Sequence, residues 1–151
     1  MRAVSATMRR CGRLLPAAVL LVLVAWCPAS AAEDQETTAV LRAARSFLDA
    51  EVNRDYGSVY ARLAPSSSYV RKHTYEDYAA AARSAQDRIV DYTIVRITYI
   101  HDNDNRAKWP CVEKFAQVEV DMVMLHIPSN QRSTINMGLV FLKENGTWYK
   151  S

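Results

Sequence analysis

The C-terminal third of the sequence reads as three consecutive antiparallel strands, and this pattern constrains the fold more than any other feature. Residues 116–122 alternate strictly, with apolar residues at the even positions and Gln, Glu and Asp at the odd ones. Side chains alternate between the two faces of a strand, so one face is apolar. A second strand covers residues 134–142. Asn145-Gly146 then predicts a two-residue hairpin that pairs Lys143 with Trp148, because both turn positions favour a positive φ.

The register of the two longer strands is predicted by matching their apolar faces. A shift by one residue would turn every side chain to the opposite face, so the parity of the register, odd or even, is strongly determined. We place Met122 opposite Leu139 and Met124 opposite Met137, which leaves Ser129–Arg132 as a four-residue loop. Trp148 then shares a face with Met137.

The first 32 residues have the composition of a secretory signal peptide. Arginines precede an apolar run at Leu14–Trp26, and Ala29-Ser30-Ala31-Ala32 fits a cleavage site. The run is too short to favour a membrane-spanning helix. We therefore expect an exported protein, periplasmic or secreted, whose domain covers residues 33–151 without a membrane span. Lipidation at Cys27 and an uncleaved anchor are the alternatives.

Removal of the signal peptide changes the charge and the cysteine count. The whole chain carries +3, but four arginines and no acidic residue lie in the signal, which leaves −1. No basic stripe remains, so a nucleic-acid partner is not expected. Only Cys111 remains of the cysteines. We expect it to be a buried free thiol, with an intermolecular disulfide as the alternative.

Polar residues of the 101–114 loop resemble a calcium loop only superficially. Asp102, Asp104 and Glu113 have suitable spacing, but Arg106 and Ala107 replace an oxygen ligand and a Gly. We find no zinc-type cysteine pairs and no glycine-rich phosphate loop. No metal and no cofactor are therefore predicted.

The N-terminal half of the domain reads as helical. Residues 36–53 carry apolar residues at helical spacing, and Asp34 or Thr37 could cap this helix. Asp55 can cap a second, short helix. Thr74 and Asp77 resemble a capping box that opens a third helix, which continues to about Gln86.

Residues 88–100 are rich in β-branched and aromatic side chains and predict a strand with apolar groups on both faces. Helices followed by consecutive antiparallel strands predict an α+β fold, with three N-terminal helices packed in a curved antiparallel sheet.

Several segments resemble nuclear-transport-factor-two-like domains. They are Phe47-Leu48-Asp49-Ala50, Asp55-Tyr56, Tyr60-Ala61-Arg62-Leu63 and the ending LVFLKENGTWYKS. Thr74-Tyr75-Glu76-Asp77-Tyr78 is similar to the third helix of small exported bacterial members. The resemblance covers the whole predicted domain. It implies a cone-like sheet around three helices, a pocket at the open end and frequent homodimers.

The same resemblance implies little about activity, because this fold carries unrelated functions. Aligned with ketosteroid isomerase, a member of this family, the chain has Phe47 and Gly138 where that enzyme carries its two oxyanion donors. Neither side chain can donate a hydrogen bond, so that oxyanion hole is absent. His126, at the end of an apolar strand face, is the one candidate for a general base.

Three functions remain open at this point. The favoured one is a non-catalytic exported domain that binds a small apolar ligand or an envelope protein. The alternatives are an isomerase- or dehydratase-type enzyme using His126, and a structural accessory module with a filled core. The expected ligand-binding residues are Phe47, Tyr78, Met122, Met124, His126, Met137, Phe141 and Trp148.

A homodimer is also expected, because the outer sheet face groups its apolar residues toward the hairpin end, and such patches usually mark interfaces. The alternative cover is the N-terminal segment or the 101–114 loop. The residues of the expected dimer face are Val123, Leu125, Val140, Leu142 and Tyr149.

Overall fold

A computed structural model describes residues 29–151, and side chains from residue 33 onward. The predicted signal peptide, with Cys11 and Cys27, lies almost wholly outside these residues. The predicted α+β class is confirmed. None of the described helices is long and apolar enough to cross a membrane. The elements are α1 (Ala29–Val52), α2 (Tyr56–Ala61), α3 (Tyr75–Ser84), β1 (Asp87–Asp102), β2 (Lys114–His126), β3 (Gln131–Glu144) and β4 (Thr147–Lys150).

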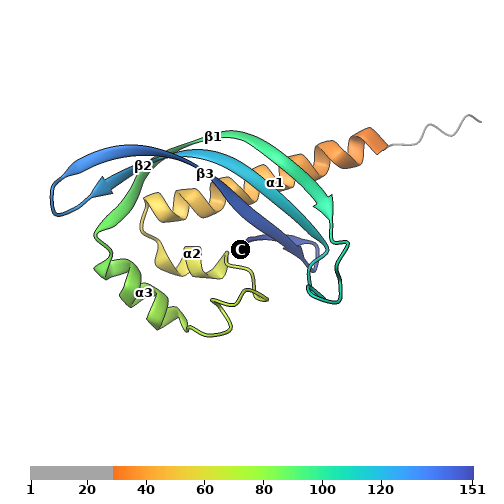
Figure 1. Ribbon diagram of the computed structural model, residues 1–151, viewed down its shortest axis with the longest axis horizontal. Helices are drawn as coiled ribbons and strands as arrows, with labels where there is room; N and C mark the ends of the chain where they lie inside the picture. The colour runs from red at the N-terminus through yellow and green to blue at the C-terminus, as the bar shows by residue number, and fades with distance from the viewer. Residues whose placement is uncertain (1–28) are drawn as a thin grey trace, which may run out of the picture.

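The four strands form one antiparallel sheet in the order β1-β2-β3-β4. The sheet curves over α1, and α2 and α3 lie below that helix (Figure 1). Val40, Ala44 and Leu48 recur at helical spacing on α1 and are completely buried. They pack against the inner sheet face, so the main core lies between α1 and the sheet.

The start of α1 differs from the prediction. Within the described residues the helix already runs from Ala29, so Asp34 and Thr37 lie inside it and neither caps it. The alanine-rich stretch before them explains the difference, because alanine has the highest helix propensity. At the other end, Arg54 adopts a φ of 58° and the Asp55 N–H donates to the Ala50 carbonyl at 2.9 Å, which closes the last turn.

The caps of the two shorter helices are confirmed. The Ser58 N–H donates to the Asp55 carboxylate at 3.1 Å at the start of α2. At the start of α3, the Asp77 N–H donates to the Thr74 hydroxyl and the Thr74 N–H donates to the Asp77 carboxylate. This capping box satisfies donors that the helix itself leaves unpaired. The third helix ends at Ser84, slightly before the expected end.

The register of β2 with β3 corrects the prediction. Met122 pairs with Ile135 rather than Leu139, and Met137 pairs with Val120 rather than Met124. The loop is therefore 127–130, and Asn130 takes a φ of 55°. The shift is even, so both apolar sets keep a common face, as parity requires. The second hairpin is confirmed, because Lys143 pairs with Trp148 and Asn145 and Gly146 have φ values of 49° and 75°.

The apolar residues predicted for both faces of β1 are accommodated by irregularities in its pairing with β2. Its register against β2 shifts between Ile89 and Asp91, between Ile94 and Arg96, and between Ile97 and Tyr99. Each shift adds an unpaired residue, which changes the parity of the strand residues beyond it. As a result, five apolar residues at uneven spacing all face the core, namely Ile89, Tyr92, Ile94, Ile97 and Ile100.

The outer sheet face is partly covered by this chain. Ala64 and Val112 form a second buried cluster with Leu142, and three residues of the same face pack against it, namely Phe115, Val140 and Tyr149. The 101–114 loop thus supplies cover at this end of the expected dimer face. Cys111, which is in the same loop, is exposed, so the expectation that its thiol is buried was wrong. The loop turns Val112 inward, and Cys111 outward.

The segment after α2 returns to the end of the sheet. Leu63 forms a parallel bridge with Lys150. The Lys150 N–H donates to the Arg62 carbonyl at 2.8 Å, and the Ala64 N–H donates to the Lys150 carbonyl at 2.8 Å. These bonds join the helical half of the domain to β4.

Candidate functional site

Four of the expected ligand-binding residues lie together in the main core. Phe47, Met122, Phe141 and Trp148 are each 7 % exposed or less. The Phe47 and Phe141 rings meet edge to face, with centroids 6.5 Å apart. These apolar side chains pack against one another and against other residues of α1.

The other expected residues are spread along the inner sheet face and α3. Tyr78 and Met124 are partly buried beside the core. Met137 is 41 % exposed, because it lies on the free half of β3 beyond the helices. The eight residues therefore do not line one common hollow.

His126 contacts an acidic side chain that the sequence did not indicate as its partner. Its Nδ1 lies 2.8 Å from an Asp87 carboxylate oxygen, and the two residues are cross-strand partners at the end of the sheet. The side chains are 40 % and 60 % exposed. Asp87 also lines a hollow of about 230 Å³ with Glu51 and Met124. This arrangement can orient an imidazole at the rim of a small hollow.

Glu51 and Tyr78 form a half-buried polar contact near this hollow. The Tyr78 hydroxyl donates to the Glu51 carboxylate at 3.3 Å. Burial raises the pKa of Glu51, and burial with the nearby Glu51 charge raises the pKa of the Tyr78 phenol. Burial also lowers the pKa of Lys150. Lys150 lines a different hollow from Glu51, beside Trp148.

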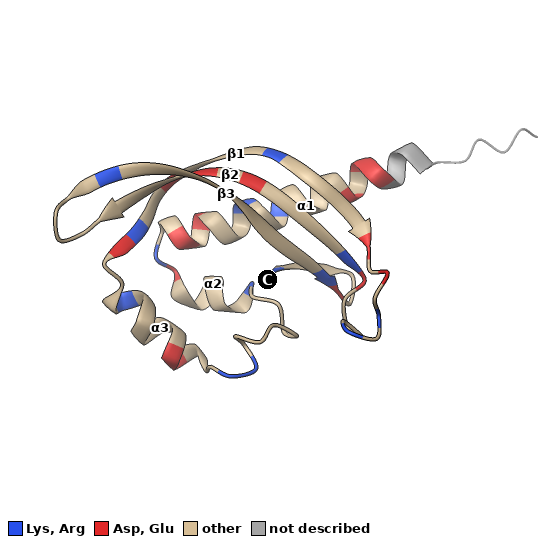
Figure 2. Cartoon of the chain, in the orientation of Figure 1, with Lys and Arg blue, Asp and Glu red and all other residues tan. Residues whose placement is uncertain are grey.

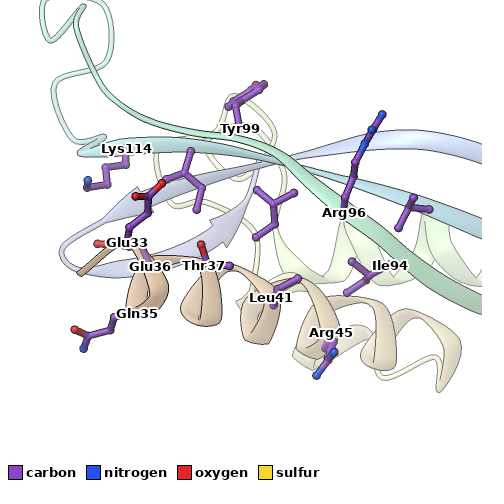
Figure 3. A pocket seen from close by; sticks show the side chains of 13 residues that line it. Glu33, Gln35, Glu36, Thr37, Leu41, Arg45, Ile94, Arg96, Tyr99 and Lys114 are labelled. Atoms are coloured by element: carbon purple, nitrogen blue, oxygen red, sulfur yellow. The ribbon is translucent and has the colours of Figure 1, made fainter. Parts of the chain in front are cut away.

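An open groove lies between α1 and β1, with a volume of about 870 Å³ (Figure 3). Leu41, Ile94 and Ile97 give it an apolar lining. Figure 3 shows Thr37 and Leu41 on the side of α1 that faces β1, whereas Arg96 and Tyr99 point to the other side of the strand. The full lining is Glu33, Gln35, Glu36, Thr37, Leu41, Arg45, Ile94, Val95, Arg96, Ile97, Tyr99, Ile100 and Lys114.

One hydrogen bond joins α1 and β1 just beyond the lining residues at one end of this groove. The Tyr92 hydroxyl on β1 donates to the Asp49 carboxylate on α1 at 2.6 Å. Burial and this bond raise the pKa of Tyr92 to about 12, so the phenol stays protonated as a donor at neutral pH. The lining residues of α1 all precede Asp49, and those of β1 all follow Tyr92. The groove therefore runs from this contact toward the start of α1.

The groove follows the free edge of the sheet. Strand β1 is the first strand in the sheet order and has a neighbour on one side only. Ile94 and Ile97 face the core, whereas Arg96 and Tyr99 face outward, yet all four line the groove. Residues from both faces of a strand can border one hollow only if that hollow lies along the strand's edge. The backbone groups of β1 that point away from β2 thus border the groove.

Charges of both signs surround the groove. Lys143 donates to Glu36 at 2.5 Å, and the Trp148 indole donates to its other oxygen at 3.1 Å. Burial tends to raise the pKa of Glu36, but these two hydrogen bonds outweigh it and the pKa is lowered. Lys114 pairs with Asp102 at 2.9 Å. Figure 2 shows acidic and basic positions interspersed along α1 and the sheet.

Within the described residues, no cluster of His, Cys, Asp or Glu is arranged to hold a metal ion. Gly138 pairs with Glu119 on the outer face, where the Gln117 side chain lies over it. Comparisons with family models, with curated proteins and with solved structures find no match.

Sequence reasoning did not find the groove. Its α1 side is the row Glu33, Thr37, Leu41 and Arg45, at four-residue intervals, and the single Leu gives this row little apolar character. The only signal for the groove in the sequence was this weakly apolar second row of α1 beside the buried one.

Proposed function

We propose that this protein is an exported, non-catalytic binding module that holds a segment of an envelope protein in the groove between α1 and β1. The open groove along the sheet edge is the observation that carries this proposal. The resemblance to nuclear-transport-factor-two-like domains, which implies a cone-like scaffold with a pocket at its open end, is compatible with a binding role. The signal peptide gives the compartment in which the partner is met.

The shape of the groove favours a polypeptide over a compact apolar ligand. The groove is open to solvent, and its α1 side spans Glu33 to Arg45, about 18 Å at 1.5 Å per residue. Small-molecule pockets usually enclose most of their ligand. The expected apolar pocket residues Phe47, Met122 and Phe141 are instead packed together in the core. That packing also suits a structural accessory module, which has no occupant.

A blocking variant with a matched control tests the proposal. Thr37→Trp places an indole in the groove, whereas Thr38→Trp places the same group on an exposed neighbouring position outside it. A random peptide library displayed on phage is panned on the unmodified domain. Selected peptides should bind the Thr38→Trp variant normally and lose at least about tenfold in affinity for Thr37→Trp. Equal binding to both variants, or no selected peptides, would refute the groove as a polypeptide site.

The acid–base alternative is favoured by one observation, the His126–Asp87 pair beside the hollow lined by Glu51 and Met124. In that function, His126 would act as the general base with Asp87 orienting its ring. A substrate screen of isomerase and dehydratase types compares the unmodified protein with His126→Ala. Turnover that disappears in the variant would support this function over the binding module.

The expected homodimer remains part of the proposal, with a contact surface smaller than the five residues predicted for it. Leu142 and its neighbours are covered by Ala64 and Val112, and Leu125 is only 7 % exposed. Val123 is therefore the residue of this face best suited to a test. Val123→Lys should convert a dimer to a folded monomer in analytical ultracentrifugation. An unmodified domain that already sediments as a monomer at high micromolar concentration would remove the dimer from the proposal.

A further inference from the structure

We infer that the occupant of the groove is an extended segment that adds to β1 as a fifth strand. This inference rests on the proposed function and specifies how the partner is held. It also specifies the partner's chemistry, because the side chains around the groove restrict which segment fits.

The backbone of β1 supplies the first part of the argument. An edge strand presents unpaired N–H and C=O groups on its free side, and an added strand satisfies them with main-chain hydrogen bonds. Here the free side of β1 borders the groove along residues 94–100. The groove thus offers a line of backbone partners rather than side chains alone.

The apolar lining supplies the second part. Ile94, Ile97 and Ile100 face inward from β1, and Leu41 lies opposite them on α1. Alternate residues of an added strand point to the same side as these isoleucines. Apolar side chains at alternate positions of the segment would therefore pack between β1 and Leu41.

The charges supply the third part. Glu33 and Arg45 lie at opposite ends of the α1 row, both are exposed, and neither forms an ion pair among the described side chains. They are about 18 Å apart along the helix. A strand covers this distance in about six residues at 3.3 Å each. A basic residue near Glu33 and an acidic residue near Arg45 would complement both ends.

These three restrictions define one pattern. The segment carries a basic residue, two apolar residues and an acidic residue at every second position, all on the face toward α1. A second copy of β1 does not match this pattern, because no stretch of β1 carries a basic, two apolar and an acidic residue in this order at every second position, in either chain direction. The inferred partner is therefore a different protein with a regular strand-forming segment.

A fluorescein-labelled peptide with threonines at the intervening positions tests the strand. Its order is Lys-Thr-Val-Thr-Ile-Thr-Glu, flanked by threonines. In a strand, the N–H groups of successive residues point to opposite edges, so residues two positions apart share an edge. N-methylation of Val and Ile blocks one edge, and N-methylation of the two threonines beside Ile blocks the other. Measured by anisotropy, one methylated peptide should lose at least about tenfold in affinity and the other should stay near the parent.

Peptides with Lys at both ends or Glu at both ends test the charges. Each should bind about two- to fivefold more weakly than the parent peptide. The Glu33→Lys protein, with cations at both ends of the row, should instead prefer the Glu peptide. Absence of these preferences would overturn the charge pattern.

The outcomes separate this inference from the proposed function. Equal affinity of the two N-methylated peptides, or no binding of the parent peptide, overturns strand addition. Either result leaves the proposed function standing, and the comparison of Thr37→Trp with Thr38→Trp remains its separate test. Sedimentation showing that the free domain pairs through β1, with the peptide dissociating that dimer, would identify a second copy as the occupant and overturn the inferred partner.

Discussion

Lys143 of β3 and Glu36 of α1 form an ion pair of 2.5 Å that fastens the helix to the sheet beside the groove. The pair is mostly buried, and Trp148 donates to the same carboxylate at 3.1 Å. Glu36→Ala should lower the free energy of unfolding by about 1–2 kcal/mol, because two donors lose a charged acceptor. Glu33→Ala, one turn earlier on the same helix, is the matched control and should change little. Urea unfolding measures both.

The pH dependence of this effect is set by the lowered pKa of Glu36. Its stabilising contribution is present above pH 4.5, the ordinary pKa of the group, and is lost as the pH falls through the lowered pKa. The difference between Glu36→Ala and the unmodified protein should therefore shrink in acid. A difference that grows below pH 4.5 would contradict the assigned role.

Glu51→Gln should show the opposite dependence on pH. Burial raises the pKa of Glu51, so its ionisation costs the folded state stability as the pH rises above 4.5. Gln keeps an oxygen to accept the Tyr78 hydroxyl but cannot ionise. The stability of the variant relative to the unmodified protein should increase between pH 4.5 and neutrality, measured by urea unfolding. A difference that stays constant with pH would show that the pKa of Glu51 is not raised by folding.

Two glycines should respond in opposite directions to the same substitution. Gly146 has a φ of 75°, which strains any L side chain, so Gly146→Ala should destabilise the domain by about 1 kcal/mol. Gly57 lies in α2, and an added Cβ would meet only ordinary contacts. Gly57→Ala should therefore stabilise the domain by about 0.4–1 kcal/mol. Thermal melts of both variants under one condition check the contrast.

His126→Ala should have a small effect on stability. The pair with Asp87 is well exposed on both sides, and such pairs contribute about 0–1 kcal/mol. We expect the melting temperature to fall by less than about 5 °C. Asp87→Ala and the double variant complete a cycle that isolates the pair. A larger fall that is shared by both single variants would identify a structural hydrogen bond.

Local signals in the sequence predicted local structure well. Asp55, Thr74 and Asn145-Gly146 each act through their own side chain or backbone within a few residues, so their roles are visible in the sequence. The register of β2 with β3 is not local. Parity excludes odd shifts, but Met122 finds an apolar partner in either Ile135 or Leu139. Asn130, which tolerates a positive φ, was a usable signal for the true loop.

The groove could not be predicted, for two physical reasons. The face that each residue of β1 presents depends on register shifts at three points, which arise from packing rather than from the residues' own preferences. The free edge of β1 depends on the order of all four strands. Likewise, the burial of Phe47 and Met122 in the core depends on how closely α1 approaches the sheet.

The bridge between Leu63 and Lys150 has a consequence for how the chain reaches its final form. A ribosome releases the helices first and β4 last. Contacts between residues far apart in sequence form slowly, since the entropy cost of closing a long loop comes before any stabilisation from the contact. The link between α2 and the sheet therefore cannot form until translation has passed Lys150. Until then the helical half lacks this partner, and the nascent chain stays open to chaperones and proteases.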